Sequence, residues 1–197
     1  MRTAGRIHAT IHSVASFDPQ RLDTEALYDY AVRTLTRRPL TVNELRARLV
    51  RRAARAPDVD AVIKRLRQAN YLDDARLAES YAHFRRDYEG LGRQRVLRDL
   101  SRRGVDKAVA HEAVAASYTD SDEPDLIRRF LERKVPQVTP PSPIDDRKQL
   151  VRLYRALIRA GFPSGKIVEA LRELSSDSDW LEAFAEAQHP EDEEAFD

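Results

Sequence analysis

Apolar residues along this chain recur every three or four positions, as they do on the buried side of a helix. The first such stretch predicts a helix that begins at Asp23 or Thr24. Thr41, with Glu44 three residues later, predicts a capping box and a second helix. Asp58 precedes a third apolar stretch, and we expect it to cap the third helix.

The same pattern begins again at Tyr71–Asp74, where one unit of three helices passes directly into the next. We expect the two aspartates of this segment to cap the following helix, because an Asp ahead of a helix accepts bonds from its first free N–H groups. That helix should end at the glycines within 89–92. A second helix is expected over about 93–103, and Gly104 and Asp106 should separate it from a third.

An apolar pair four residues apart recurs about every 50 residues, in the middle helix of each unit. It lies at Leu45–Leu49, Val96–Leu100 and Leu153–Leu157. A period of this length is typical of a repeat array in which neighbouring units cover each other's apolar faces. No segment alternates as a half-buried strand does, so the sequence predicts an all-α fold.

The pattern divides the chain into five segments. They are a mobile N-terminal extension (1–22), helical repeat 1 (23–72), helical repeat 2 (73–118), helical repeat 3 (119–174) with a proline-rich loop at 135–143, and an acidic C-terminal tail (175–197). Within the tail, Trp180, Leu181, Phe184 and Ala185 predict a short helix. Two hypotheses remain open for it: the helix docks on repeat 3, or the tail is only partly ordered.

The net charge of +1 conceals a strong asymmetry along the chain. Residues 26–117 hold 20 Lys and Arg against 12 Asp and Glu, whereas residues 173–197 hold ten acids and no Lys or Arg. A basic helical body indicates an anionic partner, with which an acidic tail can compete. The chain has no cysteine and no apolar run near the ~20 residues of a membrane span, so we expect a cytoplasmic protein.

Residues that carry chemistry are sparse. The five histidines, at 8, 12, 83, 111 and 189, do not form a spaced metal-binding pair with a carboxylate. Asp73–Asp74 could attract Mg²⁺, but capping explains both residues, and Gly90–Gly92 follows a helix, which favours a helix stop over a phosphate loop. Nucleophile elbows and a Walker lysine are absent from the sequence. We therefore expect no catalytic residue, no cofactor, no metal site and no enzyme activity.

Arginine is the remaining signal, and two hypotheses explain it. The arginines form solvated helix faces, or they contact phosphates or a partner's carboxylates along one side of the array. The acids in these stretches are too few to pair them, which favours contact. The candidate contact residues are Arg46, Arg48, Arg52, Arg93, Arg95, Arg98, Arg102, Arg103 and Lys107. Nothing picks out side chains aimed at base edges, so sequence-specific reading of DNA is unsupported.

Several of these motifs resemble the RecX family of bacterial regulatory proteins. The resemblance covers about residues 25–174 and rests on ALYDYA at 26–31, YLDDARLA at 71–78, GRQRVLRDL at 92–100, RRGV at 102–105 and RAGF at 159–162. Repeat 1 departs from the pattern, because Arg52–Pro57 stands where the other repeats have a glycine turn.

The resemblance implies three tandem three-helix repeats in an elongated, curved molecule. It further implies a monomer that binds along the groove of the RecA filament on single-stranded DNA and dampens strand exchange, ATP hydrolysis and co-protease activity, with double-stranded DNA as a further partner. The alternative is a general nucleic-acid-binding module or transcription factor that acts without RecA.

Overall fold

The computed structural model describes residues 21–119, 122–134, 144, 146–175 and 178–188. The predicted proline-rich loop at 135–143 and residues 1–20 of the predicted N-terminal extension lie outside these ranges. Among the described residues, no helix is both long and apolar enough to cross a membrane.

Repeat 1 consists of α1 (Thr24–Arg37), α2 (Val42–Val50) and α3 (Ala56–Gln68). The capping box at the start of α2 is confirmed, because the Thr41 side chain accepts from the Glu44 N–H and the Glu44 carboxylate accepts from the Thr41 N–H.

The expected cap of α3 is wrong. The helix begins two residues before Asp58, with Pro57 in its first turn, where a missing N–H costs nothing. Asp58 is buried and accepts hydrogen bonds from the Arg55 guanidinium and the Thr24 hydroxyl. The bond from Arg55 is the main reason that the pKa of Asp58 is lowered. This acid therefore ties α3 to α1 instead of capping a helix.

Repeat 2 consists of α4 (Asp74–Phe84), the π-helical turn η1 (Arg85–Glu89), α5 (Arg93–Arg102) and α6 (Lys107–Ser117). Asp73 caps α4 by accepting from the Ala75 and Arg76 N–H groups, as predicted. Its neighbour Asp74 does something else: it accepts from the Val42 N–H at the start of α2 and so connects repeats 1 and 2.

Repeat 3 consists of α7 (Asp122–Lys134), α8 (Arg147–Ala160) and α9 (Ser164–Arg172), and α10 (Ser178–Gln188) follows. Leu181 of α10 is fully buried. The Phe184 ring packs edge-on against the Tyr154 ring of α8, with the two ring centroids 5.5 Å apart. Glu182 also pairs with Arg172 of α9. In the structure, α10 at the start of the acidic tail therefore packs on repeat 3.

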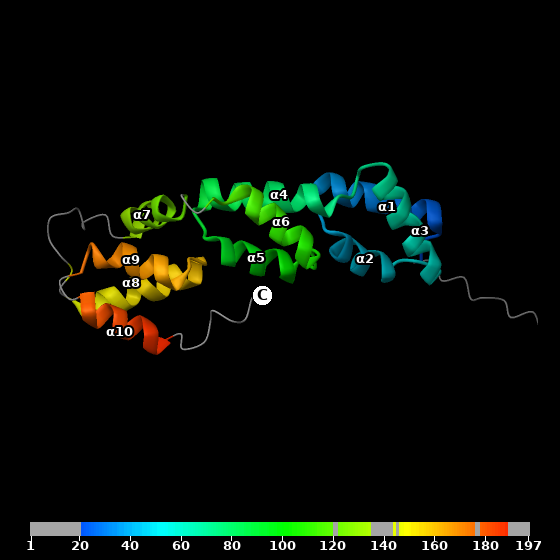
Figure 1. The fold of residues 1–197 in the computed structure, drawn as a ribbon. Helices are drawn as coiled ribbons and strands as arrows, with labels where there is room; N and C mark the ends of the chain where they lie inside the picture. The colour runs from blue at the N-terminus through cyan, green and yellow to red at the C-terminus, as the bar shows by residue number, and fades with distance from the viewer. Residues whose placement is uncertain (1–20, 120–121, 135–143, 145, 176–177, 189–197) are drawn as a thin grey trace, which may run out of the picture.

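The described residues contain no strand, only two isolated bridges, and the all-α repeat array is confirmed. Figure 1 shows the three helix trios following one another along an elongated molecule. One apolar core lies within repeat 1, around Leu27, Leu49 and Leu66. A second, larger core runs without a break through repeats 2 and 3 and includes Leu181 of α10.

The middle helices of the repeats meet end to end in the order α8, α5, α2 (Figure 1). At the first junction, the Gly92 N–H at the start of α5 donates to the Ala160 carbonyl at the end of α8 over 2.8 Å. At the second, the Thr41 hydroxyl ahead of α2 donates to the Arg103 carbonyl at the end of α5 over 2.7 Å. Unpaired helix ends therefore satisfy one another, with all three dipoles in one direction.

Candidate interface for an anionic partner

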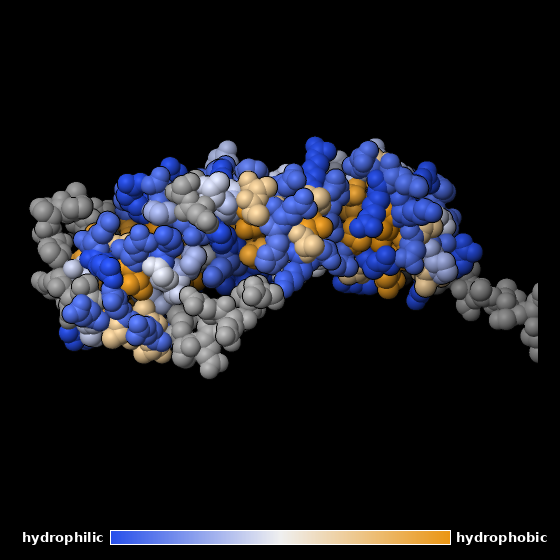
Figure 2. Space-filling view, in the orientation of Figure 1, coloured by the Kyte–Doolittle hydropathy of each residue, from blue (hydrophilic) through white to orange (hydrophobic). Residues whose placement is uncertain are grey.

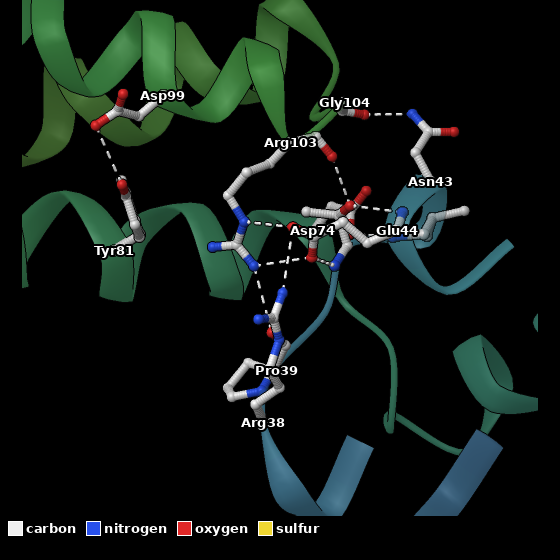
Figure 3. Close-up of polar contacts among 11 residues, drawn as sticks. Arg38, Pro39, Asn43, Glu44, Asp74, Tyr81, Asp99, Arg103 and Gly104 are labelled. Atoms are coloured by element: carbon white, nitrogen blue, oxygen red, sulfur yellow. Dashed lines mark hydrogen bonds and ion pairs between the residues drawn. The ribbon is translucent and has the colours of Figure 1, made fainter. Parts of the chain in front are cut away.

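The junction between repeats 1 and 2 is polar and centres on Arg103 (Figure 3). Its guanidinium donates to both carboxylate oxygens of Glu44, each over 3.0 Å, and to the Pro39 carbonyl over 3.3 Å. Arg38 approaches the same carboxylate at 3.8 Å. Asn43 donates to the Gly104 carbonyl beside this cluster. The two repeats are thus joined by hydrogen bonds and an ion pair, in contrast to the apolar core shared by repeats 2 and 3.

The two acids of this junction, Glu44 and Asp74, have pKa values shifted in opposite directions. Burial alone would raise the pKa of Glu44, but the hydrogen bond from Arg103 and that from the Thr41 N–H outweigh it and lower the pKa. Burial raises the pKa of Asp74, which lies in the same junction. Both carboxylates link the repeats, and Glu44 is the one whose ionised form is stabilised by the Arg103 guanidinium.

A second cluster forms around the buried carboxylate of Asp99 on α5. Arg95 donates to it over 3.1 Å, the Tyr81 hydroxyl donates over 3.2 Å, and Arg102 pairs with it as well. Burial would raise the pKa of Asp99, but the bonds from Arg102 and Arg95 lower it overall. One acid therefore engages two of the candidate arginines.

Other candidates are held by acids from neighbouring helices. Arg93 donates to the buried Glu123 of α7 over 2.6 Å, and Arg46 pairs with Asp60 of α3 at 2.6 Å. The expectation that too few acids are available is wrong for five of the nine candidates. These are Arg46, Arg93, Arg95, Arg102 and Arg103. Their partners are distant in sequence, apart from Asp99, so the local charge count could not reveal them.

The remaining candidates divide into two kinds. Arg52 lies over the Tyr30 ring, with its guanidinium carbon 4.6 Å from the ring centre. Arg48, Arg98 and Lys107 are exposed and form no ion pair within the described part of the chain. These three cations are free to meet an outside anion.

A longer row of free cations lies on α8, and none of its members is among the sequence candidates. Lys148, Arg152, Arg155 and Arg159 are all exposed and form no ion pair within the described ranges. Their spacing of four, three and four residues places them on one side of the helix. The Arg159 carbonyl accepts a bond of 3.5 Å from Arg95, so this row ends where α5 begins. This helical spacing of the four cations is present in the sequence and could have identified them as a candidate site.

The face of the molecule in Figure 2 is largely hydrophilic, and apolar residues show in separate areas. Within the described ranges, no three His, Cys, Asp or Glu residues gather to hold a metal ion. The chemistry that the geometry offers is charge: guanidinium and ammonium groups on helices arranged in one line. Positive charge distributed in this way attracts extended anions.

The fold and this surface define a tandem helical-repeat protein with a basic column of middle helices. Sequence profiles agree: residues 28–66 match the first three-helix domain of RecX, and residues 73–114 match the second. The chain belongs to the RecX family.

Individual relatives support the same assignment. The chain is 32% identical to the regulatory protein RecX of Amycolatopsis mediterranei over 149 residues, which is 74% of this chain and 83% of the relative. It is 30% identical to RecX of Deinococcus radiodurans over 77% of this chain and 69% of the relative. The crystal structure of RecX from Lactobacillus salivarius has the same fold, with a TM-score of 0.66, 21% identity, and coverage of 77% of this chain and 96% of that one.

Proposed function

We propose that this chain binds a RecA filament assembled on single-stranded DNA and inhibits its recombinase, ATPase and co-protease activities. The observation that carries the proposal is the line of middle helices, which gives a RecX-family chain an elongated body with cations along it. An extended repeat array of this kind can follow a filament groove and contact several protomers at once. The chain acts as a monomer in the cytoplasm.

The nine arginine and lysine candidates have two roles in this proposal. Arg48, Arg98 and Lys107 contact the filament or its DNA directly, because they are exposed and carry no ion pair in the described structure. The others hold the repeats in the shape that contact requires. They are Arg46, Arg52, Arg93, Arg95, Arg102 and Arg103.

The test is RecA-catalysed ATP hydrolysis on single-stranded DNA, titrated with this protein far below one copy per RecA protomer. We expect strong inhibition at that ratio, because one bound repeat array can block growth of a whole filament. Inhibition only when the protein saturates the DNA would contradict the proposal. It would support the alternative, a general nucleic-acid-binding module that competes for DNA.

A further inference from the structure

Helix α8 differs from the other middle helices in its charge. Its sequence, RKQLVRLYRALIRA, holds five cations and no acid, whereas α2 contains Glu44 and α5 contains Asp99. Those two acids each bind arginines of the array. No such partner neutralises the exposed row of Lys148, Arg152, Arg155 and Arg159 among the described residues.

The row is not explained by the stability of the helix. Like charges four residues apart, as at Lys148 and Arg152, repel each other and slightly destabilise the helix. Lys148 also lies at the positive end of the helix dipole, where a cation is unfavourable. Packing does not require the row either, because α8 is anchored by its opposite side, through Leu150, Leu153 and Leu157.

The geometry of the row indicates what it binds. With a rise of about 1.5 Å per residue, the four cations are spread over roughly 16 Å in steps of about 6, 4.5 and 6 Å. A regular line of like charges fits a chain of regularly spaced anions better than it fits the scattered carboxylates of a folded protein. The row contains no aromatic side chain on which a base could stack, so it suits the phosphate backbone.

We propose that Lys148, Arg152, Arg155 and Arg159 form a track that binds the phosphate backbone of single-stranded nucleic acid. The proposal rests on the function proposed above and deepens it, because it adds a defined DNA contact on repeat 3 to the exposed cations of repeats 1 and 2. The track ends at α5, where Arg95 donates to the Arg159 carbonyl, and it leads toward the exposed Arg98.

The experiment compares two full-length variants with the same change in net charge. The track variant replaces Lys148, Arg152, Arg155 and Arg159 by Ala. The control replaces four exposed cations of repeat 1 by Ala, namely Arg33, Arg37, Lys64 and Arg67. Binding of a fluorescent oligothymidylate, without RecA, is measured by anisotropy at several salt concentrations, and duplex DNA of equal length is measured in parallel.

We expect the track variant to lose at least tenfold in affinity for the single strand. Its plot of log affinity against log salt should be flatter by about 2–3, since each lost phosphate contact removes about 0.7 from the slope. The control should keep most of the affinity and slope. Equal losses in the two variants, an unchanged track variant, or a loss confined to duplex DNA would overturn the proposal.

Two further measurements keep the result unambiguous. If the fourfold variant does not fold, as judged by circular dichroism, the pair Arg152→Lys and Arg155→Lys is compared with Arg152→Ala and Arg155→Ala, and only the alanine pair should weaken binding. RecA ATPase inhibition is measured separately with the unaltered protein. Absence of inhibition there overturns the proposed function, whereas the track is decided by the DNA measurement alone.

Discussion

At the scale of single residues, Gly161 shows how the repeats are joined. It ends α8 with a φ of +91°, a backbone conformation that L side chains rarely adopt. A Cβ at this position would overlap the backbone of Arg95 in repeat 2, so both the local turn and the close approach of α8 to α5 require glycine.

We expect Gly161→Ala to lower the free energy of unfolding by about 2 kcal/mol or more, because backbone strain in the left-handed region adds to the displacement of α5. Urea unfolding followed by circular dichroism measures the change. Gly165→Ala is the matched control, because Gly165 lies in α9 and a Cβ added there would meet open space. That variant should be unchanged or up to about 1 kcal/mol more stable. Equal effects of the two substitutions would contradict this account of the junction.

At the scale of elements, the ion pair between α5 and α2 holds repeat 1 against repeat 2. The side chains of Arg103 and Glu44 are only 21% and 22% exposed, and their geometry is bidentate. A pair of this kind contributes more than an exposed one such as Arg65 with Glu25, whose side chains are 51% and 75% exposed.

A double-mutant cycle with Arg103→Ala and Glu44→Ala should give a coupling energy of about 1 kcal/mol at pH 7. The cycle cancels the separate loss of the capping box. For Arg65→Ala and Glu25→Ala we expect less than about 0.5 kcal/mol. Denaturant unfolding of the four proteins in each cycle measures both values. Equal coupling in the two cycles would show that the Arg103–Glu44 pair contributes no more than an exposed pair.

The same pair predicts a dependence on pH. The pKa of Glu44 in the folded protein is lowered from its usual 4.5, so its stabilising effect is fully present above that value. The effect should be lost as pH falls through the lowered pKa. The coupling energy measured at pH 3 should accordingly be smaller than at pH 7, and a larger coupling at pH 3 would contradict the assignment.

At the scale of the whole molecule, the separation of the two apolar cores predicts how the chain unfolds. Repeat 1 has its own core, whereas repeats 2 and 3 share one core that includes α10. The contacts between repeats 1 and 2 are mainly polar, and polar contacts are replaced by water at little cost when the junction opens. The chain should therefore contain two cooperative units.

We expect thermal unfolding followed by Trp180 fluorescence to differ from unfolding followed by circular dichroism. Trp180 is the single tryptophan and packs against the larger core, whereas circular dichroism reports all helices. Leu49→Ala in repeat 1 should shift only the dichroism transition, and Leu157→Ala in repeat 3 should shift both. Coincident transitions in all three proteins would indicate a single cooperative unit.

Three acids of repeats 1 and 2, Glu44, Asp58 and Asp74, show where prediction from sequence stops. The capping box of Thr41 and Glu44 is a local pattern and was predicted correctly. Asp58 has the same local appearance as a cap, but its partner Thr24 lies more than thirty residues away in sequence, and the prediction failed. The role of Asp74 as a link to Val42 was missed for the same reason.

The sequence by itself determined the helix trios, their period and the family, because these depend on spacings within about fifty residues. Only the tertiary structure decided which cations are free. It paired Arg93 with Glu123 and Arg103 with Glu44, and it left the row on α8 open to solvent. The physical reason is that an ion pair depends on distance in space, which helix packing sets, whereas a hydrophobic period is already present along the chain.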